Sequence, residues 1–177
     1  MEKLKFTLKA WPLITLITVM LCISTQCAAK LFGIDLPEQT NILLVRNCAG
    51  MNWVFASLVF QIVILLPAVE EVIFRYLLWK APLRLFRGDK SRDAIAVAAI
   101  FSAVIFSFAH YIDYLSWAHS GNITLKGIDN AFLALGFFGL AQCWLYRKTH
   151  ALSAAILNHS LFNATNLTLL FIVPTGV

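Results

Sequence analysis

Two adjacent carboxylates, Glu70 and Glu71, and the guanidinium group of Arg75 lie in a stretch, Phe55–Trp79, that is otherwise almost entirely apolar. A charged side chain at the centre of a membrane helix costs roughly 2.5 to 3.5 kcal/mol on insertion scales. Three ionisable groups so close together therefore indicate a functional site rather than a lipid-facing surface. A carboxylate shielded from bulk water is suited to act as a general base that activates a water molecule.

The spacing of these three groups predicts different tasks for them. Glu71 and Arg75 are four residues apart, so in a helix they share one face and can form an ion pair. Glu70 lies about 100° away from Glu71 around the helix axis and faces another neighbour. We predict that Glu71 and Arg75 support the site and that Glu70 is the working carboxylate. Pro67 weakens the helix just before Glu70 and can admit water to it.

Two further apolar stretches contain polar side chains that can join this carboxylate. His110 follows Phe106 by four residues, and Asn163 follows His159 by four, so each pair shares one helix face. A carboxylate, two imidazoles and an amide are the groups that water-dependent acyl transfer requires, namely a base and donors to an oxyanion. Glu70 and His159 have similar predicted depths. His110 lies too far outward unless its helix tilts or begins beyond the membrane.

Membrane helices must position these side chains. The 177 residues are 60% hydrophobic and 13% charged, and the mean hydropathy is +0.78, which is typical of an integral membrane protein. We predict one all-α membrane domain over residues 1–177, with a motif-bearing core at about 67–166. Apolar runs near the length that a bilayer requires predict five helices: Trp11–Gly33, Met51–Trp79, Ala94–Trp117, Ala131–Tyr146 and Ala151–Val173. The fourth run is short, so we expect it to extend at one end.

Basic residues predict the orientation of these helices. They gather before the first helix, between the second and third, and after the fourth, whereas residues 30–50 and 118–130 contain few. By the positive-inside rule the amino terminus is cytoplasmic and the carboxyl terminus is outside. We expect the site to open toward the cytoplasm and the protein to lie in a bacterial inner membrane. The net charge of +5 is explained by these loops and anionic lipid headgroups, so it does not indicate a nucleic-acid partner.

Three smaller features complete these expectations. Residues 1–29 can also be interpreted as a cleaved signal peptide, because a basic start precedes an apolar middle. The four cysteines form neither a disulfide framework nor a metal-type pair, and the sequence predicts no cofactor and no metal ion. Gly136 and Gly139 are predicted to allow close helix packing.

Three segments together resemble a known family: Glu70-Glu71-Val-Ile-Phe-Arg75, Phe106-Ser-Phe-Ala-His110 and His159-Ser-Leu-Phe-Asn163. In this order they are similar to the motifs of the CAAX protease and bacteriocin-processing (CPBP, Abi-type) family of glutamic intramembrane endopeptidases. The resemblance implies that Glu70 activates the hydrolytic water and that His110 assists it. It also implies that His159 and Asn163 stabilise the oxyanion. The substrate would be a membrane-associated protein or peptide with a CAAX-like, bacteriocin-type or carboxy-terminal sorting segment.

Other functions use the same groups. Glu70, His110 and His159 can serve as three zinc ligands of a membrane protease, although no His-Glu-x-x-His helix is present. A non-catalytic immunity or scaffold protein can keep the fold without the chemistry. A small transporter or proton relay also uses intramembrane carboxylates and histidines, but the two inverted halves typical of transporters are not visible in the sequence.

Overall fold

The computed structural model of the protein describes residues 1–37, 45–50, 52–79, 81–82, 91–112 and 125–172. Within these ranges the fold is all-α, with one isolated β-bridge between Ile112 and Leu125. Its main elements follow one another as α1 Glu2–Leu31, α3 Asn52–Phe60, η1 Gln61–Leu65, α4 Leu66–Glu71, η2 Val72–Leu78, α6 Arg92–Ala109, α8 Phe132–Thr149 and α9 Leu152–Ile172. The four elements from α3 to η2 are continuous and form one helix, the 52–78 helix, in which η1 and η2 are π-helical.

Three of these helices are long and apolar enough to cross a membrane, namely α1, the 52–78 helix and α6. The two other long helices, α8 and α9, lie where the fourth and fifth spans were predicted, but they are more polar. The structure therefore supports three candidate spans, and the count of five stays a prediction. Two predicted ends were wrong, because α1 begins at Glu2 and α6 ends at Ala109. The expected extension of the short fourth run is confirmed, because α8 continues to Thr149.

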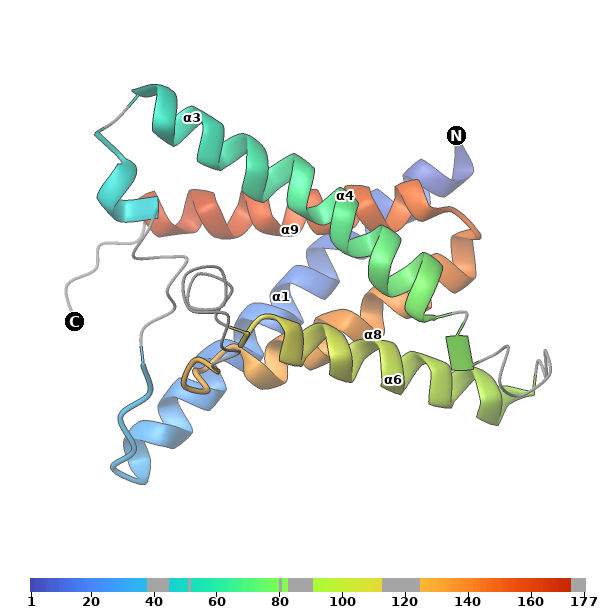
Figure 1. The fold of residues 1–177 in the computed structure, drawn as a ribbon, viewed down its shortest axis with the longest axis horizontal. Coiled ribbons are helices and arrows are strands. Elements are labelled where there is room, and N and C mark those ends of the chain that lie inside the picture. The colour runs from blue at the N-terminus through green and yellow to red at the C-terminus, as the bar shows by residue number, and fades with distance from the viewer. Residues whose placement is uncertain (38–44, 51, 80, 83–90, 113–124, 173–177) are drawn as a thin grey trace.

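The helices form a bundle in which α6 packs along α8, while α1 crosses both α8 and α9 (Figure 1). His150 adopts a left-handed conformation with φ of 49°, which turns the chain directly from α8 into α9. Two helices that are consecutive in sequence are thereby placed side by side. On its other side α9 contacts the 52–78 helix, so the segment His159–Asn163 lies next to that helix.

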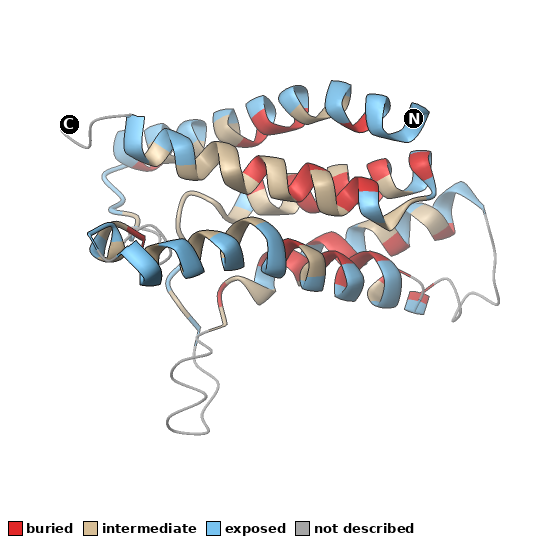
Figure 2. Ribbon diagram, turned by 90° about the horizontal axis from the view of Figure 1, so that it is seen from above, coloured by how far each residue is buried: buried red, intermediate tan, exposed pale blue. Residues whose placement is uncertain are grey.

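Burial is unevenly distributed along the bundle. Figure 2 shows that buried residues gather in the half that contains the amino terminus. In α9 the buried residues all lie between Ala154 and Phe162, and none follows Phe162. The α3 and η1 segments have no buried residue at all. The core centres on Ile14, Phe74, Phe106, Phe138 and Phe162. One half of the bundle is therefore tightly packed, and the other half is loosely packed.

Gly139 allows the close approach of α6 and α8, as predicted. A Cβ atom added at Gly139 would lie 3.0 Å from both Cα and Cβ of Ala103, whereas one added at Gly136 meets nothing within 4 Å. The packing prediction is thus confirmed for Gly139 and wrong for Gly136.

This difference gives a matched pair of variants. Gly139→Ala should lower the stability by about 1 to 3 kcal/mol, because the new methyl group meets backbone that cannot move aside. Gly136→Ala should raise it by roughly 0.8 to 1 kcal/mol through helix propensity alone. Thermal unfolding in mild detergent measures both effects. Equal shifts of the same sign would contradict the close crossing at Ala103.

Candidate active site

Glu70 and two histidines from three different helices converge at one point. The Oε2 atom of Glu70 lies 3.7 Å from Nε2 of His159 and 4.0 Å from Nε2 of His110. The side chains of Glu70 and His110 are 23% and 25% exposed, while that of His159 is 5% exposed. Glu70 Oε2 accepts no hydrogen bond from the residues that the structure describes. Glu70 therefore has two imidazole neighbours and one carboxylate oxygen, Oε2, that accepts no hydrogen bond from the described residues.

His110 reaches Glu70 because α6 ends early. The last carbonyls of a helix have no partner within the helix, and the imidazole Nδ1 of His110 donates to one of them, Phe106 O, at 2.8 Å. Only eight residues follow Glu70 in its helix, about 12 Å, whereas the 18 residues of α6 span about 27 Å before His110. The first part of α6 accordingly extends beyond the end of η2 (Figure 1). This offset accounts for the depth of His110.

His159 is held by the second carboxylate. Its Nδ1 atom lies 2.9 Å from Glu71 Oε1, and Glu71 Oε2 lies 3.0 Å from Arg75 Nε. The predicted pair of Glu71 and Arg75 is thus confirmed, and Glu71 in addition connects Arg75 to His159. Glu71 and Arg75 are both fully buried, and Arg75 Nη1 donates to Ser102 Oγ at 2.8 Å. A chain of two hydrogen bonds joined by one ion pair therefore runs from α6 through the 52–78 helix to α9.

These contacts determine which nitrogen of each imidazole carries the hydrogen. A carbonyl or carboxylate oxygen can only accept, so Nδ1 of His110 and Nδ1 of His159 both donate. In a neutral imidazole the remaining Nε2 atom is then an acceptor with a free lone pair. Both Nε2 atoms face Glu70. The site therefore presents two basic nitrogens and one carboxylate oxygen toward the same small space.

Asn163 completes a backbone hydrogen bond that Pro67 cannot make. In the π-helical η1, the N–H of Leu66 bonds to the carbonyl of Gln61. The next carbonyl in this pattern, that of Ile62, faces Pro67, which has no N–H. The side-chain amide of Asn163 donates to Ile62 O at 2.8 Å instead. One of the two amide hydrogens of Asn163 is thereby committed, and the second is available to another acceptor.

Phe106 forms a common wall for these groups. Its ring centroid lies 4.7 Å from that of His110 and 5.9 Å from that of His159. The guanidinium of Arg75 lies 5.2 Å from the same ring, within the range of a cation–π interaction. Phe106 is fully buried, so the two imidazoles and Arg75 all pack against one buried ring.

The three converging groups line a cavity of about 500 Å³. Its further walls are mostly apolar and come from the second half of α1, the start of α8 and the last turns of α9: Val19, Ile23, Ala134, Leu135, Phe138, Leu167 and Leu170. Asn163 also lines this space, so the free amide hydrogen can reach it. The cavity is large enough for a water molecule together with an extended stretch of peptide.

A polar cluster that the sequence analysis did not identify lines the same cavity. Tyr111 donates its hydroxyl to Asp129 Oδ1 at 2.6 Å, and the N–H of Lys126 donates to Tyr111 O at 2.8 Å. Burial, followed by the hydrogen bond to Asp129, raises the pKa of Tyr111 well above its usual value, so the hydroxyl stays a donor. No motif spacing connects these residues, because they belong to the segments before and after residues 113–124.

A carboxylate and two imidazoles that face one another inside a bundle of apolar helices have the groups and the geometry that general acid–base chemistry requires. A family model described as Rce1-like, type II CAAX prenyl endopeptidase, matches residues 52–165. The chain belongs to this family, and the resemblance of the three motifs is thereby confirmed. No curated protein and no solved structure matches the chain.

Proposed function

We propose that this protein is a membrane-embedded endopeptidase of the glutamate type. It hydrolyses a peptide bond near a membrane-associated terminus of its substrate. The observation that supports this proposal most strongly is the convergence of Glu70 Oε2 with the Nε2 atoms of His110 and His159 in one cavity. Membership of a CAAX endopeptidase family points the same way.

The proposed reaction begins with a water molecule between Glu70 and the two imidazoles. The separations of 3.7 and 4.0 Å leave room for one oxygen atom at hydrogen-bond distance from all three groups. Glu70 removes a proton as the water oxygen attacks the peptide carbonyl carbon. His110, held at Nδ1 by Phe106 O, accepts a hydrogen bond from the same water and orients it.

The attack produces a tetrahedral oxyanion that needs hydrogen-bond donors. The second amide hydrogen of Asn163 supplies one donor, and His159 supplies the other through Nε2, which takes up a proton from solvent before the reaction begins. Glu71 stabilises this imidazolium at Nδ1. The carbon–nitrogen bond then breaks, and the proton held by Glu70 passes to the leaving amine. Water is consumed, and one carboxylic acid and one amine are formed.

The substrate in this proposal is a membrane-associated protein or peptide, and the bilayer is the second partner. Many large apolar side chains are exposed on the helix surfaces, including Leu13, Leu16, Ile73 and Leu77. Such a surface is stable only against lipid or another apolar phase. We further propose that α8 and α9 complete five spans, that the amino terminus is cytoplasmic, and that the protein lies in a bacterial inner membrane.

Zinc-dependent hydrolysis is the second candidate, and the hydrogen-bonding state of the histidines favours it. Metal-ligating histidines commonly donate their other ring N–H to a carboxylate or a carbonyl, as His159 and His110 do. Among the described residues, however, no group of three His, Cys, Asp or Glu side chains has the geometry to hold a metal ion. The glutamate mechanism requires no such group.

Cleavage by the purified protein tests the proposal. A pool of membrane-associated peptides is incubated with the wild type and with Glu70→Gln, each with and without a strong chelator. The glutamate mechanism is supported if the chelator leaves cleavage by the wild type unchanged and Glu70→Gln cleaves none of the peptides. If the chelator abolishes cleavage and added zinc restores cleavage, the zinc mechanism would replace the glutamate mechanism. Equal product from both proteins would instead favour the scaffold function.

Asn163→Leu is expected to change two measurements at once. It leaves the carbonyl of Ile62 unpaired, which should lower stability by about 1 to 3 kcal/mol. It also removes an oxyanion donor, which should lower kcat by about 10²- to 10³-fold. Thermal unfolding and single-turnover cleavage measure the two effects. Asn166→Leu, one turn further along the same cavity wall, is the matched control. Loss of stability with unchanged kcat would limit Asn163 to a structural role.

A further inference from the structure

The cavity leads from the reacting groups toward one end of the bundle only. In the 52–78 helix the lining residues are Ile62, Leu66 and Glu70, with none after Glu70. In α9 they begin at His159 and continue to Leu170, toward the end of the helix. Glu70 and His159 therefore form the floor of the cavity. From this floor it extends about 12 to 16 Å along both helices.

Packing closes the other direction. Beyond the floor lie Glu71, Arg75, Gln142 and Asn158, which are all fully buried. Further along, Trp79 is buried, and the centroid of its ring lies 6.4 Å from that of Tyr146. Among the cavity-lining residues that the structure describes, none comes from this packed region.

The two ends of the bundle also differ in charge. The packed end contains the starts of α1, α6 and α9 and the end of α8, and it includes Lys3, Lys5, Lys9, Arg92, Arg147 and Lys148. The cavity end contains the ends of α1, α6 and α9 and the starts of α3 and α8. In its described part the cavity end contains three basic residues, Lys30, Arg46 and Lys126, against six at the packed end. The positive-inside rule thus assigns the packed end to the cytoplasm.

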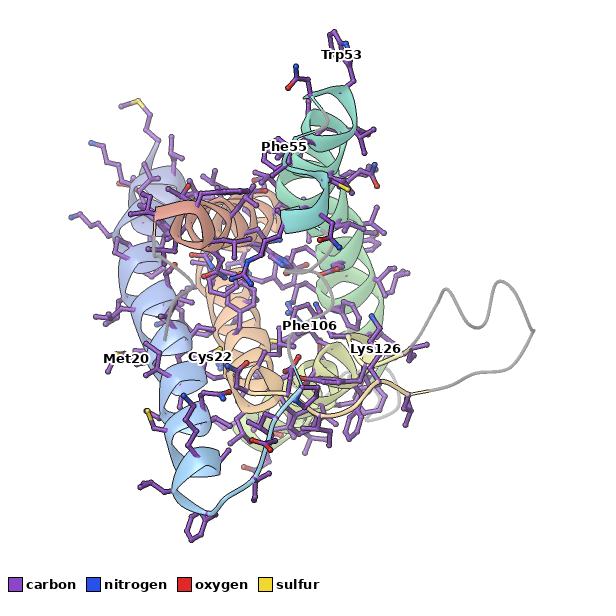
Figure 3. The ribbon with its side chains drawn as sticks, turned by 90° about the vertical axis from the view of Figure 1, so that its left-hand side faces the viewer. Met20, Cys22, Trp53, Phe55, Phe106 and Lys126 are labelled. Atoms are coloured by element: carbon purple, nitrogen blue, oxygen red, sulfur yellow. The ribbon has the colours of Figure 1, made fainter. Side chains whose placement is uncertain are left out.

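We infer that water and substrate reach Glu70 from the cavity end, which is the non-cytoplasmic side of the membrane. Figure 3 looks at the bundle from this end, with Cys22 and Lys126 on either side of the central space and Phe106 between them. The substrates are then membrane proteins whose cleaved segment leaves the bilayer on that side. This inference differs from the sequence-based expectation of a cytoplasmic opening. The direction of access does not depend on the proposed hydrolysis. Only the kind of substrate does.

Thiol labelling tests the side of access without requiring any activity. Cys22 lines the cavity, whereas Cys143 is buried in the packed region. One variant keeps Cys22 as its only cysteine, and a matched control keeps only Cys143. Two further variants lack all native cysteines and carry one new cysteine each. Lys3→Cys marks the packed end, and Ile34→Cys marks the cavity end. A membrane-impermeant, positively charged thiol reagent is applied to intact cells and to inverted membrane vesicles.

Cys22 is expected to react from the same side as Ile34→Cys, at least tenfold faster than from the side that labels Lys3→Cys. Cys143 should be protected from both sides. Reaction of Cys22 only from the Lys3→Cys side would overturn the inference, and so would protection of Cys22 from both sides. Because labelling does not depend on cleavage, a catalytically inactive protein with the expected pattern would refute the proposed function and leave this inference intact.

Discussion

Glu70→Gln is expected to lower kcat by at least about 10³-fold while leaving KM within a few-fold of the wild-type value. Glutamine has nearly the shape of glutamate, so the cavity and its walls are preserved. It has no basic oxygen of comparable strength, so the water near His110 and His159 loses the group that removes its proton. The lost interaction exists mainly in the transition state, which is why kcat rather than KM should respond.

Single-turnover cleavage measures this effect, because it isolates the chemical step from product release. Glu2→Gln makes the same change on an exposed carboxylate at the start of α1 and should match the wild type. The melting temperature of Glu70→Gln should also match the wild type, since Glu70 Oε2 makes no hydrogen bond with the described residues. A kcat reduced less than about tenfold would exclude Glu70 as the general base.

Arg75→Met is expected to have the largest effect on stability, about 3 to 5 kcal/mol. The substitution leaves the carboxylate of Glu71 fully buried without its cation, and it removes the donor to Ser102. It also removes the charge beside the Phe106 ring. The expected result is a much lower melting temperature in detergent, together with loss of cleavage.

A double variant separates folding from chemistry in this network. Glu71→Gln combined with Arg75→Met removes both buried charges, so most of the lost stability should return. Cleavage should not return, because His159 no longer has a carboxylate to stabilise its protonated form. Recovery of both stability and cleavage would show that Glu71 acts only as the partner of Arg75. A stable Arg75→Met single variant would contradict the buried ion pair itself.

The sequence was sufficient for the features that depend on local spacing. The Glu71–Arg75 pair follows from a separation of four residues in a helix. Pro67 was expected to weaken the helix just before Glu70, and the irregular, π-helical segment lies slightly earlier, at Gln61–Leu65. The separation of four between Phe106 and His110 likewise predicted their contact. Each of these features involves residues within one helix, where the geometry is known before the tertiary structure.

Features between helices were beyond the reach of that reasoning. The hydrogen bond from His159 to Glu71 joins residues 88 positions apart, and no periodicity shows which helix a given face will meet. The end of α6 at Ala109 was also missed, because the apolar stretch continues past that residue and hydrophobicity alone does not mark a helix end. The direction of the cavity depends on how tightly each half of the bundle packs, and side-chain packing is not encoded in the positions of charged residues.

The π-helical segments have a consequence for the length of the chain. A π turn accommodates one residue more than an α turn, so η1 contains a residue that a regular helix would not need. Deleting a single residue from Gln61–Leu65 would restore a regular helix and rotate Asn52–Phe60 by about 100° relative to Glu70. Ile62 O would no longer face Asn163. The number of residues before Glu70 is therefore as much a part of this site as their identity.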